Sequence, residues 1–132
     1  MKIGELSERS GLSTHTIRYY ERIGLLPYAD RDAGGRRDYD PSILTWIGFL
    51  HRLKATDMSI NDMLKIAELR LEGDHTGPQR RAILEAHREA VRDKIVVLQD
   101  CLSMLDIKIA GYAAQETEKN DEIQTVQSPI SG

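Results

Sequence analysis

The sequence predicts a mainly α-helical protein in which a small N-terminal domain is followed by one long helix. Three observations support this fold class. Residues 3–26 contain two short apolar periods separated by a glycine, and residues 27–40 are polar and rich in turn-forming residues. Residues 84–112 carry apolar side chains at alternating spacings of four and three, which is typical of a coiled-coil helix.

The first apolar segment is predicted to form two short helices joined by a tight turn. Gly11 lies at the bend, where positive φ must be tolerated, and Ser13 and Thr14 are candidate N-caps of the second helix. We expect Ile17 and Tyr20 to face the core. That rotation leaves a polar and cationic set toward solvent: His15, Arg18, Tyr19 and Arg22. A helix with this exposed face is suited to the groove of a DNA duplex.

A small two-stranded wing is predicted after Pro27, which ends the helical region. Gly34-Gly35 is a hairpin-type dipeptide flanked by short segments that could pair. The side chains that could contact a phosphate backbone at its tip or return strand are Arg36, Arg37 and Tyr39. Four aspartates offset these arginines, so an exposed charged loop is the alternative interpretation: Asp30, Asp32, Asp38 and Asp40.

Two further helices are expected to complete the N-terminal domain. The first runs from Pro41 to Lys54, with Asp40 as a candidate cap, and its apolar residues are interpreted as core: Ile43, Leu44, Trp46, Ile47, Phe49, Leu50 and Leu53. Arg52 and Lys54 close this helix. The second runs from Ile60 to about Leu71 with Met63, Leu64, Ile66 and Ala67 inward.

The remaining chain is predicted to be a linker, a long helix and a tail. Two glycines and a proline break the pattern over 73–78, and the helix then runs from 79 to 114, roughly 50 Å. Its stripe consists of Leu84, Val91, Ile95, Leu98, Leu102, Leu105, Ile109 and Tyr112, interrupted only by Arg88. One chain has no second long helix to cover this stripe, so we expect a homodimer. Residues 115–132 are polar and aperiodic, and are predicted to be disordered.

Composition narrows the class of protein. The net charge is −3, but residues 1–55 hold nine Lys/Arg against seven Asp/Glu, so the cationic surplus lies in the N-terminal domain. No membrane span, signal peptide or intramolecular disulfide is indicated, which predicts a cytoplasmic protein. No nucleophile–base pair, paired-carboxylate site or phosphate loop is visible, so we expect neither an enzyme nor a cofactor.

The N-terminal motifs resemble those of the MerR family of bacterial transcription regulators. The matching residues are Ile3-Gly4-Glu5-Leu6, Gly11-Leu12-Ser13, Thr16-Ile17-Arg18-Tyr19-Tyr20-Glu21, Gly24-Leu25-Leu26 and Arg37-Asp38-Tyr39. The resemblance implies a winged helix-turn-helix over 1–72 and a long helix that pairs antiparallel with its twin. It further implies a two-fold symmetric promoter operator that the protein distorts for RNA polymerase. The family pattern has glycine at Asp57, and aspartate tolerates left-handed geometry.

These interpretations define two sets of candidate site residues. The residues expected to contact DNA are Thr14, His15, Thr16, Arg18, Tyr19, Arg22, Arg36, Arg37, Tyr39, Arg52 and Lys54. The residues expected at the dimer interface are the eight of the apolar stripe. An architectural, excisionase-like binder or an interaction adaptor remains the alternative function.

The sensed signal is not evident from the sequence. Soft-metal sensing needs several thiolates, and this chain has only Cys101, so we expect no metal site. Cys101 is interpreted as a semi-buried packing residue beside the stripe. The chain resembles a small stand-alone family member without a C-terminal effector domain, and no small-molecule effector is identified.

Overall fold

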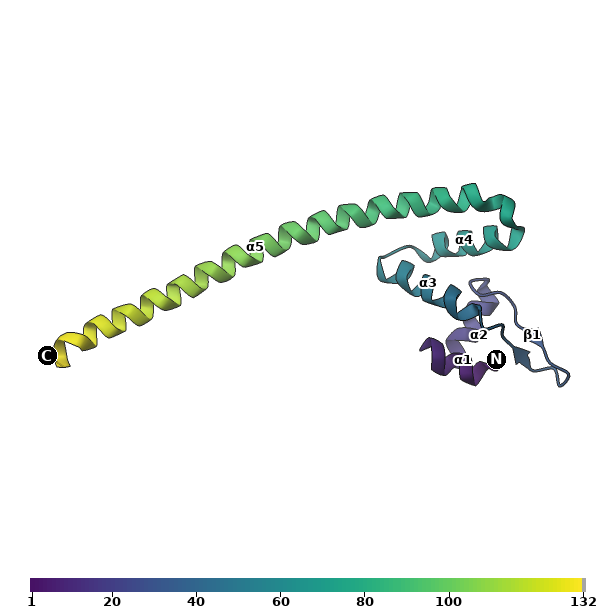
Figure 1. The fold of residues 1–132 in the computed structure, drawn as a ribbon, viewed down its shortest axis with the longest axis horizontal. Coiled ribbons are helices and arrows are strands. Elements are labelled where there is room, and N and C mark those ends of the chain that lie inside the picture. The colour runs from purple at the N-terminus through teal and green to yellow at the C-terminus, as the bar shows by residue number, and fades with distance from the viewer. Residues whose placement is uncertain (132) are drawn as a thin grey trace. The chain divides into compact units, whose positions relative to one another are not determined.

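The computed structural model describes the backbone of residues 1–131 and the side chains of residues 1–121. The described chain is mainly helical, as predicted (Figure 1). It contains α1 (Ile3–Ser10), α2 (Thr14–Ile23), β1 (Asp30–Arg31), β2 (Arg37–Asp38), α3 (Ile43–Ala55), α4 (Ile60–Glu72), the 3-10 turn η1 (Asp74–Thr76) and α5 (Gly77–Ser131). The chain is divided into two compact units, Met1–Glu89 and the part from Ala90 onward.

The turn between α1 and α2 forms where the sequence predicted it. Gly11 has a φ of 76° and donates its N–H to the carbonyl of Ser7, which closes α1. Ser13 is the N-cap of α2, and its hydroxyl oxygen accepts the N–H of Thr16 at 3.0 Å. A second left-handed glycine, Gly24, ends α2. The predicted helix-turn-helix is therefore confirmed.

The core of the N-terminal unit lies where α1, α2, α3 and α4 meet. Helix α1 contacts both α2 and α3, and α3 contacts α4 (Figure 1). Leu6, Ile17 and Leu26 are fully buried at its centre. Trp46 is also buried and satisfies its indole N–H by donating to the carbonyl of Leu25 at 2.9 Å. The interpretation of the α3 and α4 apolar residues as core is confirmed, with Leu44, Phe49 and Leu64 partly buried.

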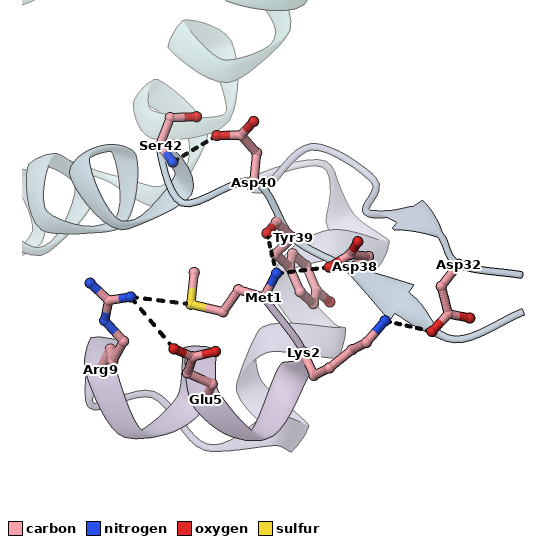
Figure 2. A network of polar contacts seen from close by, with 9 residues as sticks. All are labelled: Met1, Lys2, Glu5, Arg9, Asp32, Asp38, Tyr39, Asp40 and Ser42. Atoms are coloured by element: carbon pink, nitrogen blue, oxygen red, sulfur yellow. Dashed lines mark hydrogen bonds and ion pairs between the residues drawn. The ribbon is translucent and has the colours of Figure 1, made fainter. Parts of the chain in front are cut away.

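The start of α3 differs slightly from the prediction, whereas the turn after the helix agrees with it. The helix begins at Ile43, two residues after the predicted start, and the Asp40 carboxylate accepts the N–H of Ser42 just before it at 2.8 Å (Figure 2). Beyond its C-terminus, Asp57 has a φ of 65°, the single non-glycine positive φ among the described residues. The expectation that aspartate adopts the left-handed turn is confirmed.

The predicted linker 73–78 is more ordered than expected. Thr76 is buried in η1 and donates its hydroxyl to the carbonyl of Leu69 at 2.6 Å, while it accepts from Arg80. Helix α5 already begins at Gly77, and its first turns up to Glu89 belong to the N-terminal unit. Ile83 and Leu84 are partly buried and pack against the core there, so Leu84 is less exposed than the rest of the stripe from Ile95 onward. Its predicted place at the dimer interface stays a prediction.

Helix α5 also extends beyond its predicted end at residue 114, up to Ser131. Over residues 115–131 the described backbone is thus helical where the sequence predicted a disordered tail. Residues 115–119 contain neither glycine nor proline and are mostly good helix formers, so nothing in their chemistry ends the helix. The side chains of 122–132 and the backbone of Gly132 lie outside the described part. No helix of the described residues is both long and apolar enough to cross a membrane.

Candidate nucleic-acid interface

The second helix of the helix-turn-helix turns a cationic and aromatic face to solvent. Full burial of Ile17 sets the rotation of α2, and it leaves His15, Arg18, Tyr19 and Arg22 exposed, as the sequence indicated. The Arg22 guanidinium lies 5.3 Å from the centre of the Tyr19 ring, which holds both side chains on this face. Thr14 and Thr16 are half-buried at the start of the helix, where the Thr16 hydroxyl accepts from Ser13.

A basic hollow of about 390 Å³ lies between the start of α1, the exposed side of α2 and the wing. All of its charged lining residues are cations: Lys2, Arg18, Arg31, Arg36 and Arg37. This arrangement can hold an anionic group of phosphate size, because arginine and lysine donate charge-assisted hydrogen bonds to phosphate oxygens. The sequence indicated three of the five. Lys2 and Arg31 were missed because no local pattern links them to the others.

The wing that carries three of these arginines is built around Asp32. Strands β1 and β2 are antiparallel, with Arg31 opposite Arg37. The Asp32 carboxylate accepts the N–H groups of Gly34 and Arg36, each at 2.9 Å. It also binds the Lys2 ammonium at 2.5 Å (Figure 2). The hydrogen bond from Lys2, followed by those from the backbone, lowers the pKa of Asp32. Asp32 therefore organises the turn in addition to offsetting cationic charge.

The start of the chain ties β2 to α1. The Met1 ammonium lies 2.7 Å from an oxygen of Asp38 and 2.9 Å from the carbonyl of Tyr39, and the Tyr39 N–H donates back to the Met1 carbonyl (Figure 2). This hydrogen bond with the ammonium lowers the pKa of Asp38. Asp38 thus serves as an anchor for the return strand of the wing.

Tyr39 does not lie on the DNA-facing surface that the sequence predicted for it. It is 3% exposed, and its hydroxyl donates to a carboxylate oxygen of Glu21 at 2.8 Å. Burial, together with this hydrogen bond to an anion, raises the pKa of Tyr39 to about 12. The predicted phosphate contact of Tyr39 is corrected: the ring fills the gap between α2 and the wing, because burying it removes a large apolar surface from water.

Arg52 and Lys54 are exposed at the end of α3, as expected, but neither lines the basic hollow. The structure therefore brings Arg18, Arg36 and Arg37 together and leaves Arg52 and Lys54 outside the hollow. Their predicted contact with flanking phosphate stays a prediction.

In the second unit, α5 leaves the predicted stripe uncovered. Leu98 and Leu102 are 63% and 60% exposed, Val91 is half-buried, and the other exposed members are Ile95, Leu105, Ile109 and Tyr112. Flanking apolar residues Val97 and Met104 widen the apolar surface. Cys101 is exposed in the single chain, which differs from the semi-buried position expected for it. No cluster of metal-ligating side chains occurs among residues 1–121.

The fold and the basic hollow together define a winged helix-turn-helix DNA-binding module. Residues 2–39 match the family model described as MerR family regulatory protein, and residues 44–106 match the model described as MerR, DNA binding. The chain belongs to the MerR family of transcriptional regulators, whose members are not enzymes. The resemblance that the sequence motifs indicated is confirmed.

Similar proteins agree with this assignment over nearly the whole chain. An uncharacterized HTH-type transcriptional regulator of Haemophilus influenzae is 33% identical over 93% of this chain and 90% of that protein. A crystal structure of a protein described as a MerR family regulator from Listeria monocytogenes has a TM-score of 0.83 and 37% identity, covering 94% and 98% of the two chains. The structure of HiNmlR, a MerR family regulator lacking the sensor domain and bound to promoter DNA, has a TM-score of 0.77 and 33% identity, covering 88% and 92%.

Proposed function

We propose that this protein is a sequence-specific transcriptional regulator that binds a two-fold symmetric promoter operator as a homodimer. The observation that carries the proposal is the basic hollow beside the exposed face of α2. The two features suit different parts of a duplex. A helix with polar side chains can read base edges in the major groove, while clustered cations bind the neighbouring phosphates.

Each group of residues then has an assigned task. Arg18 and Tyr19 contact base edges or phosphate from α2, with Thr14, His15, Thr16 and Arg22 close to the groove. Arg36 and Arg37 bind the backbone from the wing, and Lys2 and Arg31 join them because they line the same hollow. Arg52 and Lys54 contact flanking phosphate. The promoter-DNA complex of HiNmlR supports this use of the module.

Homodimerisation supplies the symmetry of the operator. The exposed stripe of α5 from Ile95 to Tyr112 is apolar at coiled-coil spacing, and a second copy of the same helix in antiparallel orientation would bury it. Two identical heads then face half-sites in successive major grooves. We further propose that the protein controls transcription by bending and untwisting the promoter so that RNA polymerase can engage it. This action takes place in the cytoplasm.

The test is selection of duplexes from a random library by the purified full chain, followed by binding titrations at fixed salt. We expect a two-fold symmetric consensus and one dimer per duplex. An energy-transfer pair on the duplex ends would report bending. A monomer that binds without a symmetric preference would instead support an architectural, excisionase-like protein, and failure to enrich any duplex would contradict DNA binding altogether.

A further inference from the structure

Glu21 is a buried carboxylate that joins the recognition helix to the wing. It lies on α2, is only 3% exposed, and is the last residue of the Thr16–Glu21 motif, for which the sequence indicated no role. Its oxygens accept from Ala29 N–H at 3.3 Å, Arg37 Nε at 3.1 Å and the Tyr39 hydroxyl at 2.8 Å. All three donors lie between residues 29 and 39, so one α2 side chain holds the segment that contains the wing.

These hydrogen bonds explain how the Glu21 carboxylate can be buried. An ionised carboxylate removed from water is strongly unfavourable unless hydrogen bonds and an opposite charge compensate it. The Arg37 guanidinium supplies the charge and one donor, and the tyrosine hydroxyl and a backbone amide supply the rest. Breaking the Arg37 contact would leave the carboxylate partly uncompensated, so the pair is held in one geometry.

The orientation of Arg37 is the consequence that matters for binding. Its Nε faces Glu21, yet its side chain is 30% exposed and lines the basic hollow. The guanidinium is planar and rigid, so fixing Nε fixes the direction of the two Nη groups. The Nη donors of Arg37 that remain after the contact with Glu21 belong to a side chain that lines the basic hollow, as Arg18 also does.

We propose that Glu21 is a positioning residue for DNA binding, which orients Arg37 so that its Nη groups bind a backbone phosphate in the basic hollow. This inference rests on the proposed function. Arg36 provides the matched comparison. It neighbours Arg37 and lines the same hollow, but it is exposed, and the Glu21 carboxylate accepts from Ala29, Arg37 and Tyr39 instead.

The experiment is a double-mutant cycle on a duplex selected by the wild-type full chain. Arg37→Ala is expected to weaken binding about tenfold and to reduce the salt slope of log K by about 0.9. In the Glu21→Gln background, Arg37→Ala should cost only about twofold, because an arginine that is no longer oriented has little left to lose. Arg36→Ala should have the same effect in both backgrounds within about twofold.

The salt slope separates positioning from a purely structural ion pair. Glu21→Gln alone should lower the slope as Arg37→Ala does, because a misoriented Arg37 loses its phosphate contact, and an unchanged slope would contradict the proposal. Arg36→Ala controls for general effects on the domain. If Glu21→Gln merely loosened the domain, the effects of Arg36→Ala and Arg37→Ala would change alike, and that result would overturn the proposal. Additive effects of Glu21→Gln and Arg37→Ala would also overturn it while leaving the proposed function intact. Failure of the wild-type chain to bind any duplex would remove the proposed function and this inference with it.

A measurement on the wild-type chain covers the case in which Glu21→Gln does not fold. Nuclear magnetic resonance of the arginine side chains reports hydrogen exchange at each Nε. Arg37 Nε–H should exchange more slowly than Arg36 Nε–H in the free protein, and Arg37 Nη signals should shift on titration with the selected duplex. Equal exchange at the two arginines, or Arg37 signals insensitive to DNA, would contradict the proposal.

Discussion

The two units of this protein treat their apolar residues in opposite ways. The N-terminal unit buries Leu6, Ile17 and Leu26 within a core made by its own short helices. From Ile95 to Tyr112, the second unit presents apolar residues at coiled-coil spacing that are 48% to 66% exposed. The first unit therefore buries its apolar residues within itself, whereas the apolar stripe of the second stays exposed in the single chain, which is why we propose a second copy as its partner.

The largest expected effect comes from placing charge in the apolar stripe. Replacing Leu98 and Leu102 together by lysine should dissociate the proposed dimer, because two like charges per chain cannot be buried in an apolar seam without compensation. Sedimentation velocity would measure the change in mass. Val96→Lys is the matched control, since Val96 is exposed but lies off the stripe. A dimer that survives the double replacement would contradict the assigned interface.

The self-contained core of the first unit is tested by Ile17→Ala. Ile17 is fully buried, so truncation should lower the free energy of unfolding by about 2–5 kcal/mol through lost burial and a cavity. Chemical denaturation gives this value. Leu71→Ala is the control, because Leu71 is 69% exposed and its truncation should cost less than about 0.5 kcal/mol. Equal losses at the two positions would show that the core is misassigned.

The DNA-facing surface of the first unit is tested by Arg18→Ala. If Arg18 pairs with a base, binding to the selected duplex should weaken by about 1–3 kcal/mol at fixed salt, with specificity relaxed at one position. A loss that is uniform across sequences and lowers the salt slope would assign the residue to phosphate. Arg81→Ala is the control, because Arg81 is exposed and paired with Glu85 on α5. This variant should bind the duplex as the wild type does.

A smaller effect is expected at the turn after α3. Asp57 adopts a left-handed conformation, which glycine tolerates without the Cβ clash. Asp57→Gly should raise the free energy of unfolding by about 0.5–1 kcal/mol, less whatever the interactions of the aspartate contribute. Denaturation of the two proteins under identical conditions measures the difference. A loss of stability would contradict the assigned backbone strain at this position.

The smallest effect is expected from acid at the wing. The folded-state pKa of Asp32 lies below its ordinary value of 3.8, so its contribution is present above that value and disappears as the pH falls through the lower folded pKa. The Asp32→Asn variant should therefore lose slightly less thermal stability than the wild type as the pH falls below 4. Thermal melts between pH 6 and pH 2 would detect it, and parallel profiles for the two proteins would contradict the assignment. Glu8→Gln is a suitable control because Glu8 is exposed on α1.

Local patterns in the sequence determined the helices, the caps and the exposed faces. Glycine at Gly11 and serine at Ser13 act through their own backbone and side chain, so their roles are legible from neighbouring residues alone. The apolar spacing along α5 is likewise a property of one helix, and it indicated the exposed stripe from Ile95 to Tyr112.

Only the tertiary structure decided which polar residues are buried and which cations meet. Lys2, Arg18 and Arg31 come from three separate segments, and folding alone brings them to one hollow. Tyrosine and glutamate both carry polar groups that are common at protein surfaces. Tyr39 and Glu21 are nevertheless buried, because the wing folds back onto α2 and the two side chains hydrogen-bond to each other. The physical reason is that periodicity reports the face of a single element, whereas burial and charge clustering depend on which elements pack together.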